Sequence, residues 1–478
     1  MQLFFAASEV APFIKTGGLA DVAGSLPNAL AKLGHDVRVI LPLYSAIPAK
    51  WRRQMTFLKR FHFPLSWRNA YCGLFSLEYQ GLTYYFIDNE YYFKREGLYG
   101  QFDDGERFAY FSRAVVEVPV QLGWSPDVIH CNDWQTGLVP VYLLEARHRE
   151  PLLKHTKSVF TIHNIEYQGR FDRNILGDVL GLDEGYFRED MLSYYGDVNL
   201  VKGAIYAADY ITTVSPTYAK ELQYAFYAHG LEGVIADNYH KFTGILNGID
   251  MVHNDPANDP FLPAPYSAAD LSGKAACKAA LQEKLGLDVN PDVPIIACIS
   301  RLVGHKGFSL VTDALHEIMA MNVQMVVLGT GDWQYEAAFR EAQVQYPGRF
   351  AAQITYSAPL STAIYAGADL FLMPSVSEPC GLSQMIAMRY GTVPVVRETG
   401  GLKDTVTPYN KFEGTGRGFT FSDINAHDMV WVLREAVDLY FNNKKAWRGI
   451  QKEDMTADFS WNSSARQYLE IYQRILGW

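Results

Sequence analysis

Cysteine is scarce in this sequence, and its few cysteines are not spaced as a covalent or metal-binding framework. The chain has 478 residues, and its five cysteines are Cys72, Cys131, Cys277, Cys298 and Cys380. The number is odd and no pair has Cys-x-x-Cys spacing, which argues against a disulfide scaffold and against a zinc ribbon. We therefore expect a protein of the reducing cytoplasm.

Long apolar runs and an excess of basic charge are also lacking. No uninterrupted apolar run approaches the roughly 20 residues that a membrane-spanning helix needs. The start, Met1–Glu9, has no basic region and is expected to be a buried strand, not a signal peptide. Lysine and arginine number 42 against 52 acidic residues, a net charge of −10. Neither a membrane nor a nucleic acid is therefore an expected partner, although a local basic pocket could still hold one diphosphate.

Apolar side chains are abundant, at 49% of the sequence, which is enough to build packed cores. Short apolar runs alternate with amphipathic stretches, a pattern typical of parallel sheets covered by helices. The runs expected to form strands are Met1–Ala7, Asp36–Leu41, Leu82–Ile87, Val128–His130, Ser158–His163, Tyr210–Val214, Pro294–Ser300, Gln324–Leu328, Phe350–Thr355, Leu370–Met373, Val393–Val396 and Gly418–Phe421.

The alternation is interrupted between residues 244 and 294, where Asn-Asp-Pro and Pro-Ala-Pro turns replace it. We therefore predict an α/β protein with two doubly wound, Rossmann-like domains and a cleft between them. Ligands of such sheets bind outside the carboxyl ends of the strands. The predicted parts are an N-terminal domain over residues 1–243, a linker or hinge over 244–293, a C-terminal domain over 294–455 and a C-terminal helix over 456–478.

One short motif occurs twice, each time between an expected strand and an expected helix. Lys15 precedes Thr16–Asp21, which reads Thr-Gly-Gly-Leu-Ala-Asp, and Thr399–Asp404 reads Thr-Gly-Gly-Leu-Lys-Asp. Glycines and a helix start let backbone N–H groups approach an anion or a sugar. Neither copy is a Gly-x-Gly-x-x-Gly or Walker sequence. Gly-rich turns without a ligand are common in α/β folds, so that alternative stays open.

Two further loops follow expected strands of the second domain. Arg301 and Lys306 are five residues apart in a Gly-containing loop and could converge on one diphosphate, or form a solvated basic turn. Glu378 lies before Gly381 at an expected helix start, where it could accept sugar hydroxyls or act as a structural cap. For Cys380 a buried structural thiol is favoured over a nucleophile.

Two polar runs end strands of the first domain. His163 could bind a sugar or be a satisfied polar residue at a strand end. The run His130–Trp134 has too few neighbouring ligands to indicate a metal site.

Taken in order, these runs closely resemble those of bacterial glycogen synthases and the related plant starch synthases, over nearly the whole chain. The runs are Lys15–Asp21, HCNDW at 130–134, HNIEYQG at 163–169, VSPTYAKE at 214–221, ILNGID at 245–250, SRLVGHKG at 300–307, SEPCGLSQ at 377–384 and TGGLKDTV at 399–406.

The resemblance implies a GT-B fold and a glycosyltransferase. It implies transfer of glucose from a nucleotide sugar, usually ADP-glucose, to the non-reducing end of glycogen or a malto-oligosaccharide, with retention of configuration. It also implies no metal, no cofactor, and a C-terminal helix that packs back on the first domain. A transferase that uses another donor, such as UDP-glucose, is the main alternative, and a non-catalytic glucan-binding protein is the second.

Site residues follow from the same resemblance, position by position. The resemblance assigns Glu378 to the active-site carboxylate, His163 to the active-site histidine, and Arg301 and Lys306 to the diphosphate. The further positions expected to bind substrate are Lys15, Gly18, Asp21, Asn247, Tyr356, Cys380, Gly381, Leu382, Glu9, Asp133 and Trp134. His305 replaces a common Gln, which bears on the choice of donor nucleotide.

Overall fold

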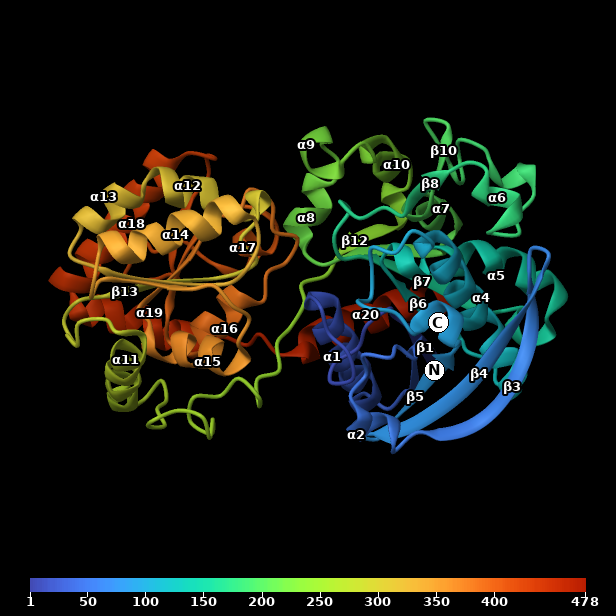
Figure 1. Ribbon diagram of the computed structural model, residues 1–478, viewed down its shortest axis with the longest axis horizontal. Coiled ribbons are helices and arrows are strands. Elements are labelled where there is room, and N and C mark those ends of the chain that lie inside the picture. The colour runs from blue at the N-terminus through green and yellow to red at the C-terminus, as the bar shows by residue number, and fades with distance from the viewer. The chain divides into compact units, whose positions relative to one another are not determined.

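The computed structural model describes residues 1–478 and contains two compact units. Unit 1 comprises Met1–Asn247 together with Trp461–Trp478, and unit 2 comprises Gly248–Ser460. The division lies four residues beyond the expected end of the first domain at residue 243. The last helix, α20 (Trp461–Leu476), belongs to unit 1, where it lies beside α1 (Gly18–Lys32) (Figure 1). No helix is long and apolar enough to cross a membrane.

Unit 1 is built on a nine-stranded sheet with the spatial order β12-β11-β7-β6-β1-β2-β5-β4-β3. Seven of these strands, from β12 to β5, pair in parallel, and the chain order reverses between β1 and β6. The strands are β1 (Gln2–Ala6), β2 (Asp36–Pro42), β3 (Thr56–Leu65), β4 (Arg68–Tyr79), β5 (Leu82–Asp88), β6 (Val128–Asn132), β7 (Lys157–Ile162), β11 (Tyr210–Thr213) and β12 (Phe242–Gly244). The longer helices, besides α1 and α20, are α4 (Asp104–Leu122), α5 (Leu138–Arg149) and α7 (Leu200–Ala207).

Two antiparallel features of unit 1 were not expected from the sequence. The long hairpin β3–β4 extends the sheet edge beyond β5 and stands out as a pair of long ribbons in Figure 1. A small sheet of order β8-β10-β9 is separate from the main sheet. Its strands are β8 (Arg170–Asp172), β9 (Ser193–Tyr194) and β10 (Asp197–Asn199). β3 alternates buried and exposed side chains in its second half, so it does not form the continuous apolar run of a buried parallel strand.

Unit 2 contains a six-stranded sheet that is parallel throughout, in the order β15-β14-β13-β16-β17-β18. In chain order this is the 3-2-1-4-5-6 arrangement of the Rossmann fold, with its switch point between β13 and β16. The strands are β13 (Ile295–Ile299), β14 (Gln324–Leu328), β15 (Phe350–Gln353), β16 (Leu370–Met373), β17 (Val393–Arg397) and β18 (Phe419–Phe421).

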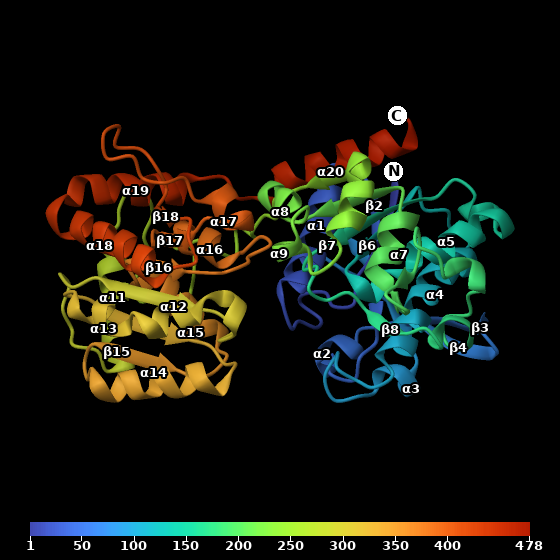
Figure 2. The same ribbon diagram turned by 90° about the horizontal axis from the view of Figure 1, so that it is seen from above.

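Helices cover both faces of the unit 2 sheet. Figure 1 shows α12, α13 and α14 on one face and α11, α15 and α16 on the other, and Figure 2 shows the same helices in the perpendicular view. These helices are α11 (Ser272–Leu285), α12 (Phe308–Asp313), α13 (Leu315–Ala320), α14 (Trp333–Gln345), α15 (Ala358–Gly367) and α16 (Ser383–Arg389), followed later by α17 (Gly400–Thr405), α18 (Ala426–Asn442) and α19 (Lys444–Thr456). The buried strand residues, such as Ile296, Val327 and Leu372, form one apolar core with the inner faces of α12, α14 and α18.

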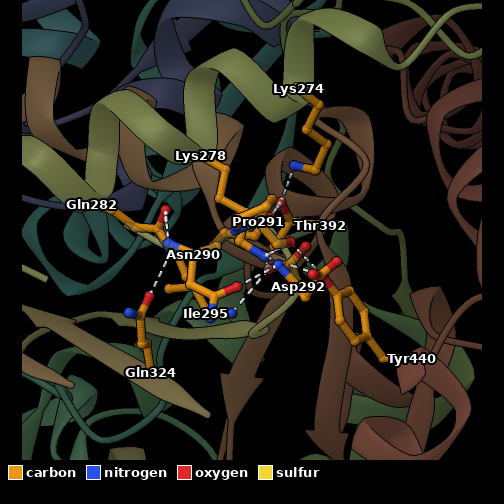
Figure 3. Close-up of polar contacts among 12 residues, drawn as sticks. Lys274, Lys278, Gln282, Asn290, Pro291, Asp292, Ile295, Gln324, Thr392 and Tyr440 are labelled. Carbon is orange, nitrogen blue, oxygen red and sulfur yellow. Dashed lines mark hydrogen bonds and ion pairs between the residues drawn. The ribbon is translucent and has the colours of Figure 1, made fainter. Parts of the chain in front are cut away.

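Helix α11 lies within the segment that the sequence analysis assigns to a linker. The structure places this segment, from Gly248 onward, in unit 2. A stripe of three polar residues, Lys274, Lys278 and Gln282, recurs every four positions along α11 and points into the unit (Figure 3). Such a stripe usually faces water, so this pattern does not indicate a packed helix.

The buried lysines of α11 are compatible with a packed interior because their ammonium groups are hydrogen-bonded. Lys274 Nζ donates at 2.9 Å to the carbonyl of Tyr390. It also donates at 2.9 Å to Thr392 Oγ1 (Figure 3). Lys278 Nζ forms an ion pair of 2.9 Å with Asp369. Burial lowers the pKa of Lys274 to about 7, since low-dielectric surroundings disfavour the charged form. These bonds fasten the segment before β13 to the rest of unit 2.

Candidate functional site

The switch point of the unit 2 sheet brings together two of the loops singled out in the sequence. One follows β13 and contains Lys306, and the other follows β16 and contains Glu378. The backbone N–H of Val376 donates to the carbonyl of His305 over 2.9 Å, so the loops are directly joined. Gly307 has a φ of +75°, and a Cβ there would lie 1.9 Å from the carbonyl oxygen of Pro374. Only glycine allows this approach, which sets the two loops side by side.

Lys306 and Glu378 form an ion pair at this junction. Lys306 Nζ lies 2.6 Å from Glu378 Oε2, which also accepts a hydrogen bond of 3.1 Å from Ser375 Oγ. Glu378 is only 6% exposed, so the charges interact in a partly desolvated place. Both contacts use the same carboxylate oxygen. The other oxygen, Oε1, takes no part in either contact and can accept further hydrogen bonds.

A third loop of unit 2, which follows β17 and contains Gly400 and Gly401, packs against the main chain of Glu378. Gly401 N donates to the carbonyl of Glu378 over 3.2 Å. At Gly400, where φ is +44°, a Cβ would lie 1.9 Å from that same carbonyl oxygen. At Gly401 it would lie 2.1 Å from the carbonyl oxygen of Cys380. The second Thr-Gly-Gly motif therefore packs against the main chain of Glu378–Cys380, and its glycines are required by this close contact.

Sequence reasoning missed two side chains that hold this loop. Arg397, at the end of β17, is 6% exposed and donates to the carbonyls of Val376 and Ser422 over 2.9 and 3.0 Å. Gln384, in the first turn of α16, donates to the carbonyl of Gly381 over 2.8 Å. The signal for Arg397 is a charged residue that directly ends an apolar strand run.

The remaining predicted residues of unit 2 are more separate. Cys380 is buried, Gly381 has a φ of +73°, and Leu382 precedes α16. Arg301 is exposed at the start of the loop after β13, and its side chain forms no bond with Lys306 or Glu378. Tyr356 is 80% exposed in the loop after β15. Both side chains are thus accessible to a ligand.

Unit 1 has its own switch point, between β1 and β6, and the predicted residues of the first domain gather around it. The stretch from the end of β1 to the first residue of α1 contains Glu9, Lys15 and Gly18. Glu9 is 2% exposed, and its carboxylate accepts from Thr16 N at 2.7 Å, Thr16 Oγ1 at 2.6 Å and Gly17 N at 3.2 Å. Burial raises the pKa of Glu9, although these bonds oppose the shift. Glu9 was expected to face substrate, but in the structure its carboxylate holds the glycine loop.

The tip of this glycine loop is open. Lys15 Nζ forms an exposed ion pair of 2.7 Å with Asp21, and both side chains are accessible. Gly18 is the first residue of α1, and a Cβ there would meet no atom within 4 Å. The backbone N–H groups at this helix start are therefore accessible to an anion.

His163 follows β7 and is held by residues that follow β6. Its backbone N–H donates to Asp133 Oδ1 over 2.7 Å, and its ring Nε2 lies 2.8 Å from Asn132 Oδ1. Asn132 donates its own amide to the carbonyl of Ala6, so its oxygen faces the ring. Nε2 therefore carries the proton and Nδ1 is an acceptor.

Burial sets the charge state of this group of residues. It lowers the pKa of His163 to about 3, so the ring is neutral at pH 7. It raises the pKa of Asp133 to about 7, and the hydrogen bonds from the backbone of His163 and Asn164 oppose that shift. Trp134 follows Asp133 directly. Asn247, the last residue of this stretch of unit 1, is 6% exposed and its Oδ1 has no protein partner.

Neither unit shows three or more His, Cys, Asp or Glu side chains grouped as a metal site would require. The two switch points thus offer cations, a carboxylate, a neutral imidazole and helix starts. Each switch point, taken by itself, presents groups that can bind phosphate or hydroxyl groups.

Two family models match the chain. Residues 2–237 match the starch synthase catalytic domain, and residues 282–452 match glycosyl transferases group 1. The glycogen synthases of Geobacillus thermodenitrificans and Geobacillus stearothermophilus are each 50% identical to it over 476 residues, which cover 100% of this chain and 98% of theirs.

Solved structures agree with these matches. The catalytic domain of starch synthase IV from Arabidopsis thaliana, bound to ADP and acarbose, superposes with a TM-score of 0.93 at 37% identity, over 100% of this chain and 99% of that one. Sucrose-phosphate synthase from Thermosynechococcus elongatus, at a TM-score of 0.62 and 17% identity over 99% of both chains, shares the fold alone. The two Rossmann-like units are those of a GT-B glycosyltransferase. The chain belongs to the glycogen and starch synthase family of glycosyltransferases.

Proposed function

We propose that this glycogen synthase family member transfers glucose from ADP-glucose to the non-reducing end of glycogen or a malto-oligosaccharide, with retention of the α configuration. The observation that carries the proposal is the pair of Lys306 and Glu378 at the switch point of unit 2. A cation beside a buried carboxylate is suited to a donor that has a diphosphate next to a sugar. The ADP in the Arabidopsis starch synthase structure supports adenine as the base.

Arg301 and Lys306 are assigned to the diphosphate. Arg301 is exposed and offers a planar fork, whereas Lys306 offers a point charge. Their charge stabilises the leaving group as the bond between the glucose C1 and the phosphate oxygen breaks. Lys15 and the open helix start at Gly18 supply further positive potential from unit 1. The pair of Lys306 with Glu378 keeps the ammonium in place before the donor binds.

Glu378 is assigned to the glucose of the donor. Its Oε1 accepts hydrogen bonds from the hydroxyl groups of that glucose. His163 is assigned to the same glucose, because its neutral Nδ1 can accept a hydroxyl hydrogen and adds no positive charge beside the forming oxocarbenium. The acceptor O4 attacks C1 from the face that the diphosphate leaves, and its proton passes to the leaving phosphate oxygen. One C–O bond breaks, one forms, and ADP departs.

The other predicted residues support this site. Tyr356 is assigned to the border of the nucleoside and Asn247 to a hydroxyl of the substrate, because its Oδ1 is buried without a partner. Gly381 and Leu382 present the start of α16, and Cys380 lines the same loop. Asp133 and Trp134 lie beside His163, while Asp21 orients Lys15 and Glu9 holds its loop. The five cysteines are buried and none of them forms a disulfide bond, which supports a cytoplasmic enzyme.

The proposal is tested by incubating the protein with a glycogen primer and either ADP-glucose or UDP-glucose, in the presence of excess EDTA. Extended α-1,4 chains formed from ADP-glucose, with undiminished rate in EDTA, are the expected result. Preference for UDP-glucose would favour the alternative donor. Glucan binding without transfer from either donor would favour a binding protein, for which Arg301 and Lys306 would have no function.

A further inference from the structure

A buried histidine of unit 1, His130, has no part in the proposed reaction but lies on a strand that leads to the site. It is 2% exposed in β6, two residues before Asn132, whose amide oxygen bonds to the ring of His163. Side chains two positions apart on a strand lie on the same face of a sheet. His130 and Asn132 therefore share one face of β6.

Both ring nitrogens of His130 are hydrogen-bonded to hydroxyl groups of other elements. Nδ1 lies 2.6 Å from the hydroxyl of Tyr472 in α20, the red helix beside unit 1 in Figure 1. Nε2 lies 2.6 Å from Thr161 Oγ1 in β7, which lies 2.6 Å from Thr212 Oγ1 in β11. Burial lowers the pKa of His130 to about 3, so the ring is neutral at pH 7 and has one donor and one acceptor nitrogen. One chain of hydrogen bonds therefore connects the C-terminal helix with three neighbouring strands.

The ring of His130 is also held by packing. It contacts the ring of Phe5 at a centroid distance of 4.7 Å and the ring of Tyr468 at 5.3 Å. Tyr468 and Tyr472 are four residues apart on α20, and both are buried. The helix thus fixes the histidine ring by contact as well as by hydrogen bonding. A change at the Tyr472 hydroxyl acts on β6 and β7, because the packed ring has little room to rearrange.

Thr161 joins this chain to the candidate site. Its side chain belongs to the chain, while its carbonyl accepts the backbone N–H of Asp133 over 3.0 Å. The carboxylate of Asp133 in turn accepts the backbone N–H of His163 over 2.7 Å. The bond between His130 and Thr161 and the bond between Asn132 and His163 both connect β6 with the chain of β7, two residues apart. The first bond therefore helps to set the spacing of the strand ends on which the second depends.

We propose that Tyr472 is a positioning residue for the transfer reaction, because its hydroxyl, acting through His130 and Thr161, holds the ring of His163 in place. The inference rests on the proposed function for the role of His163. Tyr472 is 1% exposed and is too deeply buried to contact a substrate itself. It should therefore affect the rate of transfer more than the binding of the donor.

The first test compares two substitutions in α20. Tyr472→Phe keeps the ring but leaves one nitrogen of His130 without a partner. Ile471→Val is the matched control, because Ile471 is the preceding residue, is also buried, and loses one methyl group outside the chain. Both variants should have a slightly lower melting temperature. Only Tyr472→Phe should lower kcat, roughly 3- to 10-fold, with the KM for ADP-glucose within about twofold of wild type, because a small misplacement of a reacting group slows the reaction.

Substitutions of Thr161 test the chain from its other end. Thr161→Val removes the hydroxyl and should lower kcat at least as much as Tyr472→Phe. Thr161→Ser keeps a hydroxyl and should retain more activity than Thr161→Val. Equal losses in the valine and serine variants would overturn the proposal, as would an unchanged kcat in Tyr472→Phe. An equal loss of kcat in Ile471→Val and Tyr472→Phe would also overturn it, since packing of the helix would then explain both.

A measurement without substrate separates this inference from the proposed function. The histidine rings are labelled with 15N, and the NMR signals of His163 are assigned by their loss in His163→Asn. These signals are expected to shift or broaden in Tyr472→Phe and to stay in place in Ile471→Val. That result supports the positioning chain even if neither ADP-glucose nor UDP-glucose is a substrate. Unchanged His163 signals in Tyr472→Phe would overturn the inference, whatever the transfer assay shows.

Discussion

The two copies of the Thr-Gly-Gly-Leu motif are each placed against a buried glutamate, but in opposite ways. In unit 1 the side chain of Glu9 accepts hydrogen bonds from the main chain of Thr16 and Gly17. In unit 2 the main chain of Gly400–Gly401 packs against the main chain of Glu378. The Glu9 carboxylate is thus hydrogen-bonded within its own loop, whereas the Glu378 carboxylate forms an ion pair with Lys306.

The same contrast explains why the glycines of the two motif copies differ in whether they tolerate a side chain. Gly400 has a positive φ and no space for a Cβ, while Gly18 has open space where a Cβ would be. The glycines of unit 2 are therefore structural, and Gly18 leaves its helix start open to a ligand. A repeated motif shows where loops follow strands, but the neighbours of each copy decide what its residues do.

The largest effect is expected from removal of the Glu378 carboxylate, which is assigned to the glucose of the donor. Glu378→Ala should lower kcat on the order of 100-fold or more, because a contact to the glucose that strengthens in the transition state is lost. The binding of ADP, measured by titration, should change far less. Steady-state kinetics with ADP-glucose and glycogen provide the first measurement.

The matched change in unit 1 is Glu9→Ala, which should act mainly on stability. If Glu9→Ala lowered kcat as much as Glu378→Ala while the melting temperature stayed at the wild-type value, the contrast between the two glutamates would be wrong. Near-wild-type turnover in Glu378→Ala would also contradict the assigned role.

Substitutions of Gly400 and Gly18 test whether the two glycine loops differ in the space that they leave for a side chain. Gly400→Ala should lower the free energy of unfolding by roughly 2–3 kcal/mol, because alanine is strained at this φ and its Cβ would collide with the Glu378 carbonyl. Gly18→Ala should leave stability unchanged or slightly higher, since its helical position accepts alanine without a clash. Denaturant unfolding of the two variants measures the difference. Equal losses in both would show that the open and closed loops are not distinct.

Glu9→Gln tests how the glycine loop of unit 1 is held. Glutamine has one acceptor oxygen in place of two, so the variant should lose about 1–2 kcal/mol of stability. The control is Glu78→Gln, which changes an exposed carboxylate and should leave the stability unchanged. Asn132→Asp is unsuitable as a control because it would also affect His163. Thermal unfolding of the three proteins supplies the comparison.

The same variant has a pH dependence with a definite sign. Because the pKa of Glu9 is raised above its ordinary value of 4.5, the folded state holds the proton to a higher pH than the unfolded state does. The contribution of Glu9 to stability therefore falls as the pH rises from about 4.5 through the folded pKa. The stability gap between wild type and Glu9→Gln should narrow over that range. A gap that widens with pH would contradict the raised pKa.

Much of the parallel architecture could be predicted, because buried parallel strands appear as short apolar runs. Leu370–Met373 and Gln324–Leu328 are strands with the predicted bounds. The hairpin β3–β4 was missed because β3, at the edge of the sheet, alternates buried and exposed side chains in its second half, and because the turn is marked by Ser66, not by glycine. Helix α11 was missed because three of the six residues it buries are two lysines and a glutamine, whose partners come from distant parts of unit 2.

The candidate site shows the same limit. The sequence indicated Glu378 and Lys306 separately, as members of loops after two strands. Their pairing depends on the strand order β13-β16, which brings together residues 72 positions apart. Arg397 could not be assigned because its role is to bind carbonyls of a neighbouring loop. The individual residues of the site could therefore be predicted from the sequence, but the residues that they contact from other strands and loops could not.

The smallest change in stability is expected at the open tip of unit 1. Lys15 and Asp21 form an exposed pair, so Lys15→Ala and Asp21→Asn should each alter the free energy of unfolding by less than about 0.5 kcal/mol. Their effects on the reaction should differ. Lys15→Ala removes a cation assigned to the phosphate side of the donor and should raise the KM for ADP-glucose. Asp21→Asn keeps an acceptor oxygen that can orient Lys15 but removes the competing negative charge, so it should leave that KM unchanged or lower it.

The dependence of KM on salt concentration distinguishes a direct charge effect of Lys15 on the diphosphate from an effect through its bond to Asp21. If Lys15 acts on the diphosphate by charge, added KCl should raise the wild-type KM for ADP-glucose more steeply than that of Lys15→Ala, because screening weakens an attraction that the variant no longer has. If Lys15 matters only through its bond to Asp21, the two variants should show the same KM at every salt concentration. That outcome would assign both copies of the motif a purely structural role, and the contrast between an open and a closed loop would have no functional consequence.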